Sequence, residues 1–210
     1  MKYLMMVAII IVVCNSLFAE EETLYSGSVE NGWYAALTFN VGPIMDETGY
    51  FIGGKGGWII NHCFVLGAKG YILLNPVDHP GLQNIHVGFG CGGLLLEYIF
   101  NSDKLWHFSI ENMIGLAGVY NDISKSSQPH DPIDYTGESG FIMEPGLNIH
   151  LNVMKNFRIS SGLSYRWITG LDYDPGAPYR TVIPNEYEDI SGSSDLNGFM
   201  FNIAFQYGLF

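Results

Sequence analysis

The chain has 210 residues, a formal charge of −12 at pH 7, and only 14% charged residues against 48% hydrophobic ones. Soluble domains carry about 25% charged residues, so this chain lacks the groups that cover an ordinary water-facing surface. The hydrophobic fraction excludes a long disordered chain, and the acidic balance excludes nucleic acid as a partner because it would repel phosphate. The 26 glycines, 13 tyrosines and 13 phenylalanines favour a β domain with many turns.

Residues 1–19 have the pattern of a secretory signal peptide. Lys2 supplies a positive charge, and Tyr3 to Val13 form an apolar stretch that is too short to span a bilayer as a helix. Ser16 to Ala19 then form the cleavage region of a signal peptide, which ends in a small residue and precedes an acidic run. We therefore expect cleavage after Ala19. The sequence therefore predicts export, with a periplasmic segment over 20–32 and a folded domain over 33–210.

In the folded domain, large apolar residues alternate with small or polar ones at the period of a β-strand. At the C-terminus the odd positions from Phe199 to Leu209 are large and apolar, and the even positions from Met200 to Gly208 are mostly small or polar. Segments 141–152 and 157–167 show the same division. Eight strands are expected, over residues 33–41, 50–60, 64–74, 84–99, 105–119, 139–152, 157–170 and 197–210.

The expected connections alternate in length. Short turns at 61–63, 101–104 and 153–156 alternate with longer segments, rich in Pro, Gly, Asp and Ser, at 42–49, 75–83, 120–138 and 171–196. A chain that begins and ends on one side of a membrane, with its long loops opposite, must alternate in this way. Because backbone groups in lipid must all be paired, the sequence predicts an eight-stranded antiparallel up-and-down transmembrane β-barrel. A soluble barrel or sandwich is the alternative architecture.

The signal peptide, the eight amphipathic strands and the aromatic last strand ending in Phe210 resemble the small outer-membrane β-barrels of Gram-negative bacteria, of the OmpX and OmpA-transmembrane-domain type. Gly53 to His62, followed by Phe64 to Tyr71, resembles a motif of uncharacterised outer-membrane barrel proteins, which brings no known activity. The resemblance implies an outer-membrane location, contact with outer-membrane lipid and lipopolysaccharide, and recognition of the last strand by the barrel insertion machinery. We expect a monomer.

In that family the apolar residues of the last strand share the parity of the terminal Phe. Here the apolar residues are odd-numbered and Phe210 is even-numbered, so a bulge near Gly208 is expected to restore the register.

With the small and polar face of each strand inside, seven charged residues gather in the lumen: Lys55, Lys69, Glu97, Glu111, Glu144, Arg158 and Arg166. A register that pairs Asn152 with Arg158 sets Glu144 opposite Arg166. Unpaired charge in a dry site is costly, so a paired network is predicted, and it should close a lumen that has room for little besides side chains. Supplementary partners are expected from Thr38, Asn40, His107, Ser109, Asn148, His150, Asn202 and Gln206. A gated ion or proton path is the alternative.

Two positions conflict with this register. The turn at 61–63 places Lys55 beside Lys69, and like charges opposite one another are destabilising, so either a glutamate lies between them or the register is shifted by one residue. His86 and Glu97 differ in parity, so both can face the lumen only if the strand bulges, for example at Gly92–Gly93.

Cysteine and histidine spacing give little support to a metal or disulfide site. Cys63 and Cys91 are interpreted as unpaired packing residues, and neither a C-x-x-C nor an H-E-x-x-H pattern occurs.

The predicted outer loops carry a net charge of −11, with Lys125 and Arg180 against thirteen acids: Asp46, Glu47, Asp78, Asp122, Asp131, Asp134, Glu138, Asp172, Asp174, Glu186, Glu188, Asp189 and Asp195. The surrounding lipopolysaccharide is itself anionic, which indicates bridging divalent cations or a cationic partner. Asp172 and Asp174 resemble the start of a calcium loop, and Glu186, Glu188 and Asp189 could complete an oxygen shell. A merely solvated acidic loop is the alternative, and no other cofactor is expected.

Catalysis has weak support. His130, Asp131, Ser126 and Ser127 lie together in one predicted outer loop, but no G-x-S-x-G pattern occurs. The predicted role is therefore structural or surface-binding, such as adhesion, envelope integrity or capture of a cation. The alternatives are a narrow OmpW-like channel for small or hydrophobic solutes and a lipid A-modifying outer-membrane enzyme.

Overall fold

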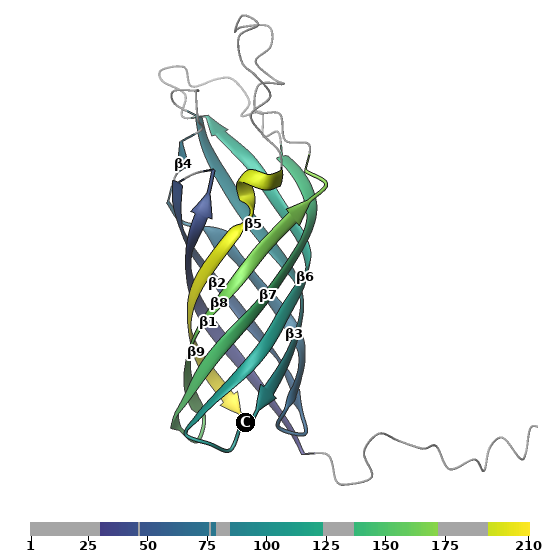
Figure 1. Cartoon of the computed structure of the whole chain (residues 1–210), viewed down its shortest axis with the longest axis vertical. Helices are drawn as coiled ribbons and strands as arrows, with labels where there is room; N and C mark the ends of the chain where they lie inside the picture. Colours follow the sequence, from purple (N-terminus) through teal and green to yellow (C-terminus); the bar gives the residue numbers. More distant parts are fainter. Residues whose placement is uncertain (1–29, 46, 76, 79–84, 124–136, 172–192) are drawn as a thin grey trace, which may run out of the picture.

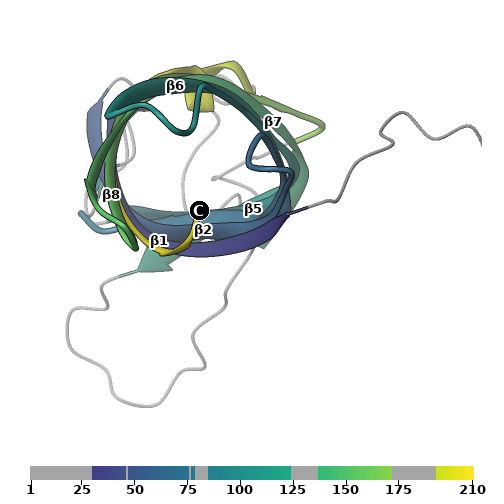
Figure 2. The ribbon, with the colours of Figure 1, turned by 90° about the horizontal axis from the view of Figure 1, so that it is seen from below.

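The structure, a computed structural model, describes residues 30–45, 47–75, 77–78, 85–123, 137–171 and 193–210. These residues form one antiparallel sheet that closes into a barrel (Figure 1, Figure 2). Its strands are β1 (Asn31–Ile44), β2 (Glu47–Ile60), β3 (Phe64–Leu73), the two-residue β4 (Val77–Asp78), β5 (Ile85–Phe100), β6 (Trp106–Ile123), β7 (Gly137–Met154), β8 (Phe157–Thr169) and β9 (Gly198–Leu209). A short 3-10 helix, η2 (Ser193–Leu196), precedes β9.

The first and last strands close the barrel. β9 pairs with β1 from Trp33↔Leu209 to Val41↔Phe201, and β3 pairs with β5, with β4 extending that edge. Closure leaves no free sheet edge among the eight long strands, since each has two hydrogen-bonded neighbours. The eight-stranded, antiparallel, up-and-down barrel predicted from the sequence is confirmed. Among the described residues, no helix is long and apolar enough to cross a membrane.

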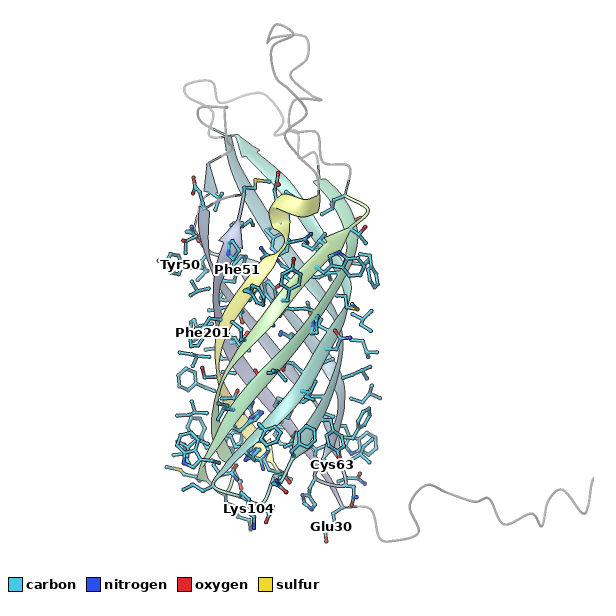
Figure 3. All side chains as sticks on the ribbon, viewed as in Figure 1. Glu30, Tyr50, Phe51, Cys63, Lys104 and Phe201 are labelled. Atoms are coloured by element: carbon cyan, nitrogen blue, oxygen red, sulfur yellow. The ribbon has the colours of Figure 1, made fainter. Side chains whose placement is uncertain are left out.

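The two faces of the barrel are those that the period-two pattern predicts. The large apolar residues point outward, with Phe199 63% exposed and Leu147 61% exposed, and the labelled Tyr50 and Phe201 project away from the barrel in Figure 3. The inner residues of the same strands are buried, from Met200 to Gln206 on β9. This outward apolar band suits lipid rather than water.

The short turns are confirmed, and they lie at the same end of the barrel as the C-terminus (Figure 1). Asn61, His62 and Asn101 adopt positive φ angles of 53°, 57° and 51° in these turns. Asparagine tolerates this left-handed conformation because its short side chain can bond the local backbone.

The expected long loop at 42–49 is wrong. β1 and β2 stay paired up to Ile44↔Glu47, so only Met45 and Asp46 connect them. Gly42 and Pro43 gave a false loop signal. Pro43 lies beyond Val41, the last β1 residue paired with β9, and a missing N–H is tolerated where a ladder has ended.

The strands also extend into the other predicted loops. β6 runs to Ile123, β7 begins at Gly137, and η2 occupies the end of the segment 171–196. Residues 79–84, 124–136 and 172–192 lie outside the described part of the chain, as do residues 1–29 with the expected signal peptide.

Two apolar clusters occupy the ends of the lumen. We call the first the loop-end cluster; it contains Ile44, Met45, Phe51, Tyr71, Val77, Phe89, Met113, Ala117, Val119, Ile142, Ile168, Leu171, Leu196 and Met200. We call the second the turn-end cluster; it contains Tyr34, Ile59, Val65 and Ile99, with Ala36 and Phe210 packed against it. The loop-end cluster draws on most of the long strands, whereas the turn-end cluster lies on β1, β2, β3 and β5. On β6 to β9 the buried residues at the turn end are polar: His107, His150, Arg158 and Gln206.

Candidate functional site

Two lysines and two glutamates form an ion-pair network in the middle of the barrel. Lys55 Nζ donates to Glu111 Oε2 at 2.6 Å, and Lys69 Nζ donates to Glu111 Oε1 at 2.7 Å and to Glu144 Oε1 at 2.8 Å. All four side chains are at most 2% exposed. Removal of such charges from water is costly, and only close pairing with further hydrogen bonds makes it tolerable.

Lys55 and Lys69 are direct neighbours across β2 and β3, as the register predicted. Glu111 binds one lysine with each of its carboxylate oxygens, which confirms the first of the two alternatives that the sequence left open. The row that holds the two lysines continues across β5 and β6 as Gly93 and Gly115. Because these glycines carry no side chain, the lysines have room to lie against that wall and reach Glu111.

Two hydroxyl groups complete the shell of Glu144. Tyr71 Oη donates to Glu144 Oε2 at 2.5 Å, and Ser164 Oγ donates to Glu144 Oε1 at 2.9 Å. The sequence reasoning did not include Tyr71. It shares the parity of Lys69 on the same strand, and that parity was the signal that could have found it.

Glu97 forms a second branch with mostly uncharged partners. Tyr34 Oη donates to Glu97 Oε2 at 2.6 Å, and Ser109 Oγ donates to Glu97 Oε1 at 2.6 Å. His150 Nε2 lies 2.9 Å from Ser109 Oγ and 3.5 Å from Glu97 Oε1, and the ring of His107 stacks on that of His150 with 4.9 Å between centroids. Tyr34 was another residue that the sequence reasoning missed.

Arg158 lies apart from the lysines, at the turn end. Its guanidinium is 3.6 Å from the centroid of the Phe210 ring, and Nη2 donates to Ser102 O at 3.4 Å. Phe210 in turn stacks on Tyr34, with ring centroids 6.3 Å apart. The pairing of β9 with β1 is continuous through Gly208, so the expected bulge is absent and the even-numbered Phe210 packs inside the barrel.

Arg166 also lies outside the network, at the loop end. Its Nε donates to Leu196 O at 2.5 Å, and Nη2 donates to Pro43 O. The guanidinium lies 5.2 and 5.0 Å from the ring centroids of Phe51 and Phe89. Arg166 therefore ties η2 and the end of β1 to the loop-end cluster.

The expected ion pair between Glu144 and Arg166 is wrong, although the register behind it is present. Asn152 pairs with Arg158, which sets Glu144 level with Arg166. The Glu144 carboxylate binds Lys69 instead, and the long arginine side chain extends toward the loop end. The strand register fixes the backbone position of each side chain, and the length and rotamer of the side chain determine which groups it contacts.

The expected supplementary partners are all buried: Thr38, Asn40, His107, Ser109, Asn148, His150, Asn202 and Gln206. Some of them bond within the wall. Gln206 Nε2 donates to Ser160 Oγ at 3.0 Å, and Asn148 Nδ2 donates to Ser109 Oγ at 3.5 Å.

The bulge expected at Gly92–Gly93 is absent, because β5 pairs with β6 without interruption from Ile85 to Phe100. The side chain of His86, for which that bulge was invoked, lies outside the described part of the chain. Cys63 and Cys91 are both free thiols, as expected.

The predicted outer-loop sites cannot be placed in the barrel. Asp172, Asp174, Glu186, Glu188 and Asp189 lie outside the described residues, and so do Ser126, Ser127, His130 and Asp131. Within the described ranges, no three His, Cys, Asp or Glu side chains are grouped so that they could hold a metal ion.

No family model matches the chain, and no curated protein matches its sequence. Among solved structures, it is similar to the crystal structure of Neisserial surface protein A, with a TM-score of 0.58 and 10% identity, over 86% of this chain and 99% of that one. It is also similar to the N-terminal β-barrel domain of OprF from Pseudomonas aeruginosa, with a TM-score of 0.51 and 11% identity, over 87% of this chain and 100% of that one. At these identities the likeness shows the fold.

Proposed function

We propose, for a chain with the fold of the small eight-stranded outer-membrane β-barrels, that it spans the bacterial outer membrane as a monomer and acts at the cell surface in a structural or binding role. The outer face supports insertion in lipid, because its large side chains are apolar over the length of the strands. The proposal assigns the chain no catalytic step.

The filling of the lumen is the observation that carries this proposal. The loop-end cluster fills one end, the turn-end cluster packs with Phe210 and the stacked Arg158 at the other, and the lysine and glutamate side chains between the two ends are paired and buried. A conducting pore needs a continuous polar path, whereas an eight-stranded barrel leaves an interior just wide enough for side chains. A surface role follows from this arrangement more readily than transport does.

The outer loops supply the binding chemistry that we propose. Their net charge of −11 would repel the anionic lipopolysaccharide around the barrel unless cations lie between them. We expect these carboxylates to take a divalent cation such as calcium, with Asp172 and Asp174 as first ligands, or a cationic partner.

Membrane insertion and pore formation are tested on the same purified protein. We expect extraction from outer membranes only by detergent, and slower electrophoretic mobility after boiling than without heating. Planar-bilayer recording should show no discrete conductance steps. Reproducible steps would contradict the surface role and favour the narrow OmpW-like channel, and a protein found in the soluble periplasmic extract would contradict the membrane barrel itself.

Calcium binding is tested by calorimetric titration of the detergent-folded barrel. We expect heat of binding at millimolar calcium, and loss of that heat in an Asp172→Asn, Asp174→Asn double variant. Asp103→Asn is the matched control, because Asp103 is an exposed acid in the turn at the opposite end of the barrel. An unchanged titration in the double variant, or no heat in the parent protein, removes the calcium site.

A further inference from the structure

Arg166 is a buried cation at the loop end of the barrel, with an exposed fraction of 0%. Its Nε donates to Leu196 O and its Nη2 to Pro43 O, but its Nη1 is buried without a hydrogen-bond partner in the structure. Among the described residues no acid lies within ion-pair distance of Arg166, and both oxygens of Glu144 on the neighbouring strand bind other donors. A buried charge without a counter-charge is costly, so this arginine lacks an anion.

The other surroundings of the guanidinium are aromatic. Its central carbon lies 5.2 Å from the ring centroid of Phe51 and 5.0 Å from that of Phe89, and both rings belong to the loop-end cluster. Ring faces attract a cation without occupying its N–H groups, and the planar fork of an arginine binds the two oxygens of a carboxylate in parallel. The setting therefore suits a carboxylate that is attached to an apolar group.

Leu196 on η2 already offers part of this chemistry to the site. Its side chain is 2% exposed and packs in the loop-end cluster, and its carbonyl oxygen accepts from Arg166 Nε. A peptide carbonyl group supplies one neutral oxygen, whereas a carboxylate supplies two oxygens and a negative charge. Leu196 thus fills the place of such a ligand but leaves Arg166 without a counter-charge.

η2 lies at the rim between β8 and β1, before β9 begins at Gly198, and it is the short coil at the loop end in Figure 1. The end of β1 holds it through the N–H of Met45, which donates to Asp195 O at 2.8 Å. β8 holds the following residue through the N–H of Ile168, which donates to Asn197 Oδ1 at 2.6 Å. A short segment outside the sheet ladder opens at a lower free energy than the strands do, so η2 can leave the rim while the barrel stays closed.

We propose that the loop end of the barrel is a binding site for a small apolar carboxylate, and that η2 and this ligand compete for it. The carboxylate binds Arg166 in place of the Leu196 carbonyl group, and the apolar tail replaces the Leu196 side chain in the loop-end cluster. η2 then lifts from the rim. This inference goes beyond the surface role proposed above and does not depend on the cation site of the outer loops.

The acidic outer loops oppose the approach of an anion but not its binding at Arg166. Their net charge of −11 acts at long range, and salt screens such repulsion beyond a Debye length of about 8 Å at physiological ionic strength. A buried pair is screened much less. The affinity for the carboxylate should therefore rise as salt is added, and a fall would indicate an exposed ion pair and contradict the buried site.

The direct test is a titration of the full-length folded barrel with isocaproate, a carboxylate with a branched apolar tail like that of leucine. We expect the methyl resonances of Met113 and Met200, which lie in the loop-end cluster, to shift and to saturate at millimolar ligand. Limited proteolysis near η2 should become faster with the ligand, because η2 is displaced. Acetate lacks the tail and isohexanol lacks the charge, so neither should have these effects.

Each alternative outcome of this titration overturns the proposal. Equal binding of acetate would leave an adventitious ion only, and equal binding of isohexanol would remove the role of Arg166. Isocaproate without a saturable shift would exclude the site altogether. Slower proteolysis near η2 with bound ligand would contradict the competition.

Variants test the competition independently. Leu196→Ala removes the competing side chain, so it should tighten isocaproate binding by about tenfold or more, with the preference over isohexanol retained. Val65→Ala is the matched control, because Val65 is equally buried in the turn-end cluster, and it should leave the affinity unchanged. Arg166→Met should abolish the preference for the carboxylate over the alcohol. An unchanged affinity in Leu196→Ala, or an unchanged preference in Arg166→Met, would refute the assignment.

Discussion

Glu111→Gln is the substitution that most directly probes the ion-pair network. In the native barrel the carboxylate of Glu111 binds Lys55 at 2.6 Å and Lys69 at 2.7 Å, at 1% exposure. Glutamine keeps the shape and removes the charge. Lys69 retains Glu144, but Lys55 has no other carboxylate within ion-pair distance in the described structure, and it stands beside Lys69 on the neighbouring strand.

The expected loss of stability is large. Removal of one partner from a buried ion pair costs about 3–5 kcal/mol, because it leaves an uncompensated buried charge. The direct opposition of two lysines on adjacent strands adds to that cost. We therefore expect Glu111→Gln to lower the free energy of unfolding by roughly 3–5 kcal/mol.

Urea unfolding in lipid vesicles measures this loss through the fluorescence of the 4 tryptophans, with heat-dependent electrophoretic mobility as a check on folding. Glu97→Gln is the matched control, since one of the Tyr34 and Ser109 hydroxyl groups can still donate to the amide oxygen and the other can accept from the amide NH2 group. Adding Lys55→Met to Glu111→Gln should restore much of the lost stability, because it removes the orphaned cation. A loss below about 1 kcal/mol for Glu111→Gln, as in an exposed pair, would refute this reasoning.

Three further predictions concern other parts of the barrel. Arg166→Met removes the bonds to Leu196 and Pro43, so a protease should cleave the folded barrel near η2 faster than it cleaves the parent. Pro145→Val should raise the urea midpoint, because β7 and β8 form no pair at Glu144 and Pro145 and proline has no N–H to donate. Phe210→Ala should cost about 1–2 kcal/mol through the lost contact with Arg158, and a larger defect in membrane assembly than in refolding would indicate that insertion also depends on this residue.

The sequence predicts the two faces of the barrel well because strand geometry is strictly periodic. A side chain two positions along a strand returns to the same face, so the outward Phe199 to Leu209 and the inward Lys55, Lys69 and Glu111 follow from parity alone. The neighbour relation between Lys55 and Lys69 follows as well, because a short turn fixes the register of the hairpin.

Contacts across the lumen could not be predicted in this way. Tyr71 reaches Glu144 from β3 to β7, a distance set by barrel closure and strand tilt rather than by any local pattern. The contacts of Arg166 could not be predicted for a related reason. Its flexible side chain donates to backbone carbonyl groups at the loop end instead of to the Glu144 carboxylate, which lies level with it on the neighbouring strand. The even parity of Phe210 alone predicts its inward position correctly, because the pairing of β9 with β1 continues without a bulge through Gly208.

The charged residues inside the barrel oppose local strand pairing and favour the closed structure. Lys55 pairs with Lys69 on one hairpin, and Glu97 pairs with Glu111 on the next, so each hairpin alone sets like charges side by side. The repulsion within the lysine hairpin is relieved only when Glu111 and Glu144 face the lysines across the lumen, which requires the sheet to close in this register. A strand shifted by one residue would turn these charges toward lipid, where they are more costly still. The network therefore disfavours shifted pairings, in addition to the register set by the alternating apolar face.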